Sequence, residues 1–98
     1  MPAYKAPVRD IRFLMNEVFD YPAHYKTLSN GESADSDTID MIIEGAADFC
    51  ENILSPLNQS GDEEGCHFKD GEVTTPKGFK EAYDQFVQGG WQGLSYPE

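Results

Sequence analysis

The chain has 98 residues, with 18 acidic side chains against 7 basic ones and a formal net charge of -11. That length allows one domain at most, and the acidic balance argues against binding to nucleic-acid phosphates or to an anionic membrane surface, since both need Lys and Arg. No apolar run approaches a membrane span, and charged residues interrupt the first twenty positions, so we expect a soluble cytoplasmic protein. Cys50 and Cys66 fit no disulfide framework and are expected to be free thiols.

The first expected element is a short amphipathic helix over about residues 8–20. It is indicated by six apolar residues at helical spacing: Val8, Ile11, Leu14, Met15, Val18 and Phe19. Phe13 lies off this stripe, which is ordinary for a small helix and also typical of a helix that a second domain or subunit covers. Tyr21 and Pro22 end the helix, and Pro22 suits the first position of a further helical turn. Asn30–Gly31 then predicts a turn in a polar connection.

The central element is a helix predicted over about residues 36–57. Asp35 is its expected N-cap, and the apolar stripe is broad enough to need partners on more than one side. Pro56 removes a backbone donor, so the helix should kink or stop within about a turn of it. The stripe consists of Ile39, Ile42, Ile43, Ala46, Phe49, Cys50, Ile53, Leu54 and Leu57.

A long non-helical excursion is expected from Gln59 to Thr75. Within it, Asp70–Gly71 lies between two short runs that favour β-structure, which predicts the tip of a small hairpin. An isolated two-stranded hairpin is marginal, so this one should pack on the helices.

The third helix is predicted over about residues 76–88. Thr75 and Pro76 resemble an N-cap followed by a proline at the first helical position, and Gly89–Gly90 should stop the helix. Trp91 and Leu94 are expected to fold back onto the core. The fold class is therefore all-α, with three main helices in a single domain over residues 1–98.

Two candidate metal sites fail on spacing. The acidic residues Asp62, Glu63, Glu64, Asp70 and Glu72 suggest calcium, but a binding loop counted from Asp62 has His67 where Gly is needed and Val73 where Glu is needed. Zinc ligands could come from His24, Cys50, Cys66 and His67, but their spacing fits no finger or ribbon, and Cys50 lies on an apolar stripe.

Catalytic and phosphate-binding patterns are no better supported. His24, Ser60 and Cys66 lack a recognised nucleophile–base arrangement. No phosphate loop between a strand and a helix is formed by five of the nine glycines, which are Gly31, Gly61, Gly65, Gly89 and Gly90. Residue chemistry therefore assigns no catalytic, cofactor-binding or metal residue, and the aromatic set Phe79, Tyr83, Phe86 and Trp91 is best interpreted as packing.

Three segments carry a family resemblance: Ser55–Cys66 (SPLNQSGDEEGC), Val73–Tyr83 (VTTPKGFKEAY) and Gly89–Leu94 (GGWQGL). In order and spacing they resemble the N-terminal region of acyl-CoA dehydrogenases, within the long bacterial subclass that includes the methylmercaptopropionyl-CoA dehydrogenases. The opening, with Tyr4–Pro7 and Glu17–Tyr21, resembles the N-terminal extension of that subclass. The resemblance covers essentially the whole chain.

The resemblance implies an FAD enzyme that oxidises an acyl-CoA thioester to the α,β-enoyl-CoA, with a carboxylate base and a hydride passed to the flavin. In that family the catalytic glutamate and most flavin contacts belong to later domains. The expectation is therefore a truncated helical segment that is structural, binds no flavin itself and is inactive alone. Its partners would be the remaining domains of the same enzyme, with acyl-CoA as the parent's substrate.

The isolated segment should leave apolar surface uncovered, so a homo-oligomer is expected. Two alternatives remain open. One is a free-standing acidic helical interaction module that binds a partner through its aromatic face, and the other is a calcium-binding domain.

Overall fold

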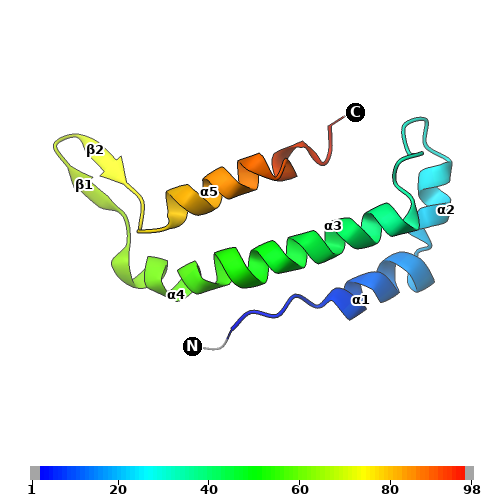
Figure 1. Ribbon diagram of the computed structural model, residues 1–98, viewed down its shortest axis with the longest axis horizontal. Helices are drawn as coiled ribbons and strands as arrows, with labels where there is room; N and C mark the ends of the chain where they lie inside the picture. The colour runs from blue at the N-terminus through cyan, green and yellow to red at the C-terminus, as the bar shows by residue number, and fades with distance from the viewer. Residues whose placement is uncertain (1–2, 97–98) are drawn as a thin grey trace. The chain divides into compact units, whose positions relative to one another are not determined.

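The computed structural model describes residues 3–96 and is mostly helical. The all-α prediction is therefore confirmed only as a mostly-α fold, because a small two-stranded sheet is also present. The described chain forms two compact units, one of residues 4–51 and the other of residues 52–96 together with Ala3. Figure 1 labels the helices and strands of both units. No helix within residues 3–96 combines the length and the apolar character that crossing a bilayer requires.

In the unit of residues 4–51, helix α1 (Val8–Phe13) continues into a wider π-helical turn, η1 (Leu14–Val18). The amide of Phe19 donates to the Leu14 carbonyl at 3.0 Å, five residues back, and closes this turn. Asp20 then adopts a left-handed conformation with φ of 48°, and the chain turns into α2 (Tyr21–Lys26). Pro22 has no amide to continue the first helix and lies in the first turn of α2, as predicted.

The connection after α2 depends on a close approach at Gly31. Gly31 is buried, and a Cβ at this position would overlap the Tyr25 carbonyl. Its amide donates to the Leu28 carbonyl at 3.2 Å. The turn predicted at Asn30–Gly31 is thus present, and it requires glycine for space.

Helix α3 (Ser36–Phe49) begins as predicted. The Asp35 carboxylate accepts a hydrogen bond from the Thr38 amide at 2.8 Å, which confirms Asp35 as the N-cap. In Figure 1, α1 lies alongside α3 within this unit.

The predicted end of the central helix near residue 57 is wrong. The helical backbone continues from α3 through a π-helical turn, η2 (Cys50–Leu54), into α4 (Ser55–Glu64). A proline clashes with the carbonyl four residues earlier, which for Pro56 belongs to Asn52 inside η2. A locally widened turn at that point accommodates the ring, so the helix runs on for two further turns.

The second unit contains the predicted hairpin, formed by β1 (His67–Lys69) and β2 (Glu72–Thr74) in antiparallel register. Asp70 and Gly71 both have positive φ, 53° and 80°, as in the type I′ turn that an Asp-Gly pair favours. Helix α4 ends at Gly65, so residues 59–64 are helical, contrary to the expected excursion. The expectation that the hairpin packs on the helices is also wrong, because every strand residue is exposed.

Helix α5 (Phe79–Gln88) begins three residues later than predicted. Its N-cap is Gly78, in a left-handed conformation with φ of 91°, so Thr75 is not the cap and Pro76 is not the first helical residue. The helix ends before Gly89, as expected, and a 3-10 turn, η3 (Trp91–Gly93), follows. The three-helix description is therefore not confirmed: the central helical run extends further than predicted, and shorter helical elements precede and follow it.

Little apolar surface is fully buried. Among the described residues Ala82 is the buried hydrophobic residue, at 5% exposure. Trp91 is half-buried, whereas Leu94 is 60% exposed and does not fold back as predicted. In the second unit, α5 meets α4 where the Phe79 ring lies against Gly61, so closely that a Cβ there would stand 2.5 Å from the ring.

Candidate functional site

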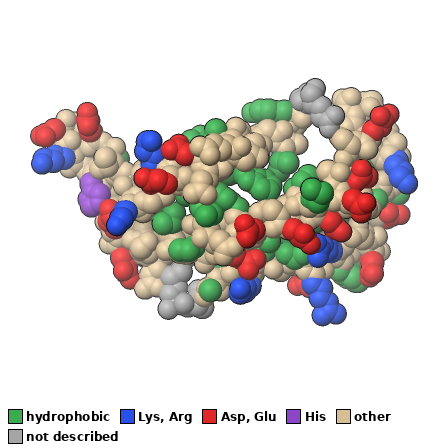
Figure 2. All heavy atoms as spheres, in the orientation of Figure 1, with side chains coloured by type: hydrophobic (Ala, Val, Ile, Leu, Met, Phe, Trp, Pro, Cys, Tyr) green, Lys and Arg blue, Asp and Glu red, His purple; other side chains and the backbone are tan. Residues whose placement is uncertain are grey.

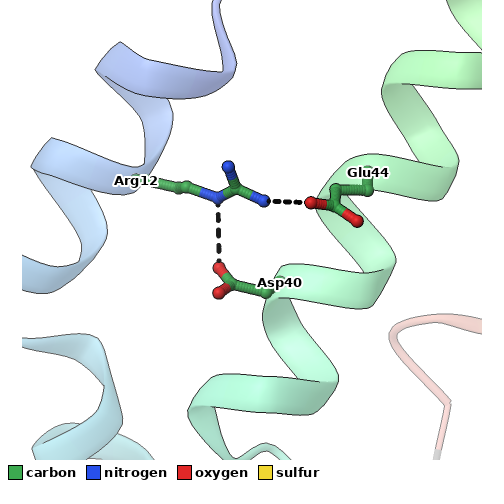
Figure 3. Close-up of polar contacts among 3 residues, drawn as sticks. All are labelled: Arg12, Asp40 and Glu44. Carbon is green, nitrogen blue, oxygen red and sulfur yellow. Dashed lines mark hydrogen bonds and ion pairs between the residues drawn. The ribbon is translucent and has the colours of Figure 1, made fainter.

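The best-defined polar cluster joins α1 to α3. The Arg12 guanidinium donates from Nε to Asp40 Oδ1 at 3.2 Å and from Nη2 to Glu44 Oε1 at 2.8 Å (Figure 3). Asp40 and Glu44 are four residues apart, so both carboxylates lie on one face of α3. The cluster is a charged clamp within the first unit.

The two carboxylates keep Arg12 in its charged form. The hydrogen bond that Arg12 donates to Glu44, followed by the charge of Asp40 and the hydrogen bond donated to it, raises the pKa of Arg12. Arginine is in any case charged at all biological pH values. The arginine side chain is 34% exposed, and the carboxylates of Asp40 and Glu44 are more exposed still. A fixed cation held by two carboxylates positions helices and has no proton to exchange.

A second polar cluster surrounds Glu64 at the end of α4. Its Oε2 lies 2.8 Å from His67 Nε2, and its Oε1 accepts a hydrogen bond from the Lys77 amide at 3.1 Å. The bond to His67 and then that to Lys77 lower the pKa of Glu64. One carboxylate thus ties the base of the hairpin to the turn that precedes α5.

The candidate calcium residues are not assembled into a site. Asp62, Glu63 and Glu64 belong to helix α4 and not to a loop, whereas Asp70 and Glu72 lie at the hairpin tip. Within residues 3–96, no group of three or more His, Cys, Asp or Glu side chains is placed to hold a metal ion.

The candidate zinc and catalytic residues are also dispersed. Cys50 is half-buried in η2 and Cys66 is exposed, and both are free thiols. His24 contacts the rings of Tyr21 and Tyr25 at centroid distances of 6.3 and 6.0 Å. His24 and Cys50 belong to one unit, whereas Cys66 belongs to the other.

Ser60 likewise has a local partner, because its hydroxyl lies 3.4 Å from the Pro56 carbonyl one turn earlier in α4. Such a back-bond along a helix is structural. Among the hydrogen bonds described for the chain, none pairs Ser60, Cys66 or Cys50 with a histidine base.

Flavin chemistry needs a cradle for a large cofactor, and the described residues do not fit one. The two strands have three residues each and are exposed. The segment between β2 and α5 carries one glycine, Gly78, which lies against the Leu57 side chain.

Sequence reasoning missed both polar clusters. The available signal was the spacing of Asp40 and Glu44 on one helical face, together with an arginine on the neighbouring amphipathic helix. The Glu64 cluster had no such signal, because it depends on a helix that was expected to end earlier.

Comparison with known proteins identifies one that is similar in sequence to this chain. No family model matches it. Over nearly its whole length, however, the chain is similar in sequence to an acyl-CoA dehydrogenase, which confirms the resemblance inferred from its motifs.

That relative is the 3-methylmercaptopropionyl-CoA dehydrogenase of Ruegeria pomeroyi. The two sequences are 39% identical over 94 residues, which make up 96% of this chain and 16% of the relative. The chain thus spans about one sixth of the length of the enzyme that it matches.

Proposed function

We propose that the chain is the N-terminal helical portion of a longer, FAD-dependent acyl-CoA dehydrogenase. The observation that carries this proposal is the 39% identity that extends over 96% of the chain. Similarity over so much of the chain covers the helices, the hairpin and the glycine turns together, and it is more specific than any single motif.

In the proposed parent, the reaction is the α,β-dehydrogenation of an acyl-CoA thioester. The flavin would accept hydride from the β-carbon, while a carboxylate base removes the α-proton. Neither role falls on a residue of this chain. Its own contribution is to hold helices in place, as Arg12 does between α1 and α3, and to offer apolar surface to the rest of the enzyme.

A structural role for the segment is supported by how little of its apolar surface is buried. Phe13, Phe19 and Met41 are 53%, 59% and 74% exposed in the first unit. Hydrophobic side chains also lie at the surface in Figure 2. On α5, Tyr83 is 65% exposed. Exposed apolar area on this scale is typical of a surface that other polypeptide covers.

An acidic interaction module is the second candidate. Its support is the same exposed aromatic surface combined with a net charge of -11, which would favour a basic partner. The two candidates differ in whether the chain belongs to a longer polypeptide: the enzyme requires one, whereas the module functions alone.

The test is an assay on the longest polypeptide that carries this chain. Purified protein is mixed with 3-methylmercaptopropionyl-CoA or straight-chain acyl-CoA thioesters and an artificial electron acceptor, and acceptor reduction is recorded. The proposal expects turnover with at least one thioester by the longer polypeptide and none by residues 1–98 alone. Absence of turnover with every thioester would contradict the enzyme assignment.

A further inference from the structure

The β1–β2 hairpin has one apolar face with no cover. Phe68 and Val73 stand directly opposite each other in the ladder and are 75% and 66% exposed. Residues directly opposite each other in an antiparallel pair point to the same face, so these two side chains share one face. The other face is polar and carries the pairs His67 with Thr74 and Lys69 with Glu72.

The base of this hairpin is held in position. Glu64 bonds both to His67 at the start of β1 and to the Lys77 amide that follows β2. In Figure 1 the hairpin projects beyond the ends of α4 and α5, the helices of its own unit. The apolar pair is therefore presented outward on a short arm with a tight type I′ turn at its tip.

An exposed hairpin of this kind has little stability of its own. Two-stranded hairpins are marginally stable in water and gain stability when one face is packed. An aromatic and a β-branched side chain directly opposite each other also form a favourable cross-strand pair, and their outer apolar area is available to a partner.

We propose that the Phe68–Val73 face docks into an apolar groove in the part of the parent enzyme that this chain does not include. This inference rests on the proposed function. The chain spans only 16% of its relative while matching it along 96% of its own length, so most of the relative has no counterpart here and can supply the groove.

A second copy of the chain is a less favoured partner for the Phe68–Val73 face than the rest of the parent enzyme. Each copy carries a net charge of -11, and a symmetric contact between hairpins would bring the carboxylates of Asp70 and Glu72 close to their own equivalents. Like charges oppose such a contact, whereas an apolar groove elsewhere in the polypeptide carries no such penalty.

The test is hydroxyl-radical footprinting with mass spectrometry on the unmodified protein. Oxidation of Phe68 is compared between residues 1–98 at low concentration and the longer polypeptide, with His67 on the opposite face as the internal control. Docking lowers the oxidation rate of Phe68 roughly tenfold or more in the longer polypeptide, since interface cores pack as tightly as protein interiors. The rate at His67 stays within about twofold, because that face remains in water.

Equal oxidation of Phe68 in both proteins would overturn the inference. So would protection of Phe68 in residues 1–98 that grows with their concentration, since a second copy would then cover the face. A gene product of only 98 residues overturns both the inference and the proposed function.

Paired variants give a second readout. The double variant Phe68→Ser, Val73→Thr should lower the thermal midpoint of the longer polypeptide and leave that of residues 1–98 nearly unchanged. The matched control on the polar face, Lys69→Gln with Glu72→Gln, should affect neither protein.

The two proposals fail separately. If Phe68 is protected in a longer polypeptide that binds no flavin, the enzyme assignment is contradicted and the docking proposal stands. If the longer polypeptide binds flavin but Phe68 stays exposed, only the docking proposal is contradicted.

Discussion

Individual charged residues hold this chain together at helix ends and between helices. Asp35 caps α3, Arg12 bridges α1 and α3, and Glu64 ties α4 to the hairpin. Each charge has a local partner in hydrogen-bonding geometry, but all lie at the surface. Their contributions should therefore respond to pH and salt, and these responses can be measured separately.

The Asp35 cap predicts a specific dependence on pH. The backbone bond from Thr38 lowers the pKa of Asp35, so the folded state binds this proton more weakly than the unfolded state. The stabilisation is complete above the ordinary Asp pKa of about 3.9 and is lost as the pH falls through the lower folded-state pKa. Asp35→Ala should therefore lower the thermal midpoint at neutral pH, and the difference from the native chain should shrink in acid.

Asp35→Asn is the matched control, because it keeps an oxygen that can accept the Thr38 bond. Thermal melts at a series of pH values should place this variant above Asp35→Ala at neutral pH. Equal loss in both variants would mean that charge, and not the capping bond, provides the stabilisation.

The Arg12 clamp predicts a dependence on salt. Arg12→Gln removes both ion pairs, which should lower the thermal midpoint by a few degrees at most in dilute buffer, since exposed ion pairs contribute little. At about 1 M salt the Debye length falls to roughly 3 Å and the effect should nearly vanish. Arg9→Gln, one turn earlier on α1, is the control, and an equal effect there would show that the clamp is not specific.

At the scale of elements, the sequence predicts best where a local signal decides the structure. The Asp35 cap, the Asp-Gly hairpin turn and the stop at Gly89 were all predicted, because each depends on a few neighbouring residues. The continuation past Pro56 was not predicted. It depends on a π-helical turn, which has no simple sequence pattern.

The start of α5 shows the same limit. Thr75 and Pro76 look like a good helix start, yet Pro76 is buried and the helix begins after Gly78. Gly78 takes a left-handed conformation in contact with Leu57, an arrangement set by residues about twenty positions apart. Contacts over that separation decide which of two plausible starts is used, and a single sequence does not contain them.

The contact between α4 and α5 predicts that one substitution, Gly61→Ala, changes the free energy of unfolding in opposite directions depending on the residue at position 79. Gly61→Ala improves helix propensity by about 1 kcal/mol but drives its Cβ to within 2.5 Å of the Phe79 ring. Overpacking of this kind costs about 1–3 kcal/mol, so the single variant should be less stable by about 1 kcal/mol in urea unfolding. In a Phe79→Leu background the ring is gone, and the same change should become neutral or stabilising. Destabilisation of equal size in both backgrounds would show that the ring is not responsible.

At the scale of the whole molecule, two properties of the chain oppose each other. A net charge of -11 keeps copies apart, while many large apolar side chains are exposed in both units. Composition alone predicted the first property. The second was expected only through the family resemblance, which implies a truncated segment with uncovered apolar surface. The broad stripe on the central helix indicated partners by itself but did not indicate where they lie.

The balance between charge and apolar surface predicts salt-dependent self-association of residues 1–98. Added salt screens the repulsion and leaves apolar attraction, so the weight-average mass in sedimentation equilibrium should rise from low to high ionic strength. A monomer at every salt and protein concentration would contradict this expectation.

No candidate site could be completed from the sequence, since the reactive side chains are dispersed over two units. The family resemblance, by contrast, was visible from motifs around the glycine turns, and the similarity to a dehydrogenase over 94 residues supports it. Function in this chain is therefore indicated by overall sequence similarity more than by any local chemistry.

The most direct test of the central claim is the absorption spectrum of two purified proteins, residues 1–98 and the longest polypeptide that carries them. If the chain is part of an acyl-CoA dehydrogenase, the longer polypeptide should show a flavin band that bleaches when an acyl-CoA thioester is added, and residues 1–98 should show none. A longer polypeptide without flavin, or a flavin band in residues 1–98 alone, would contradict the account.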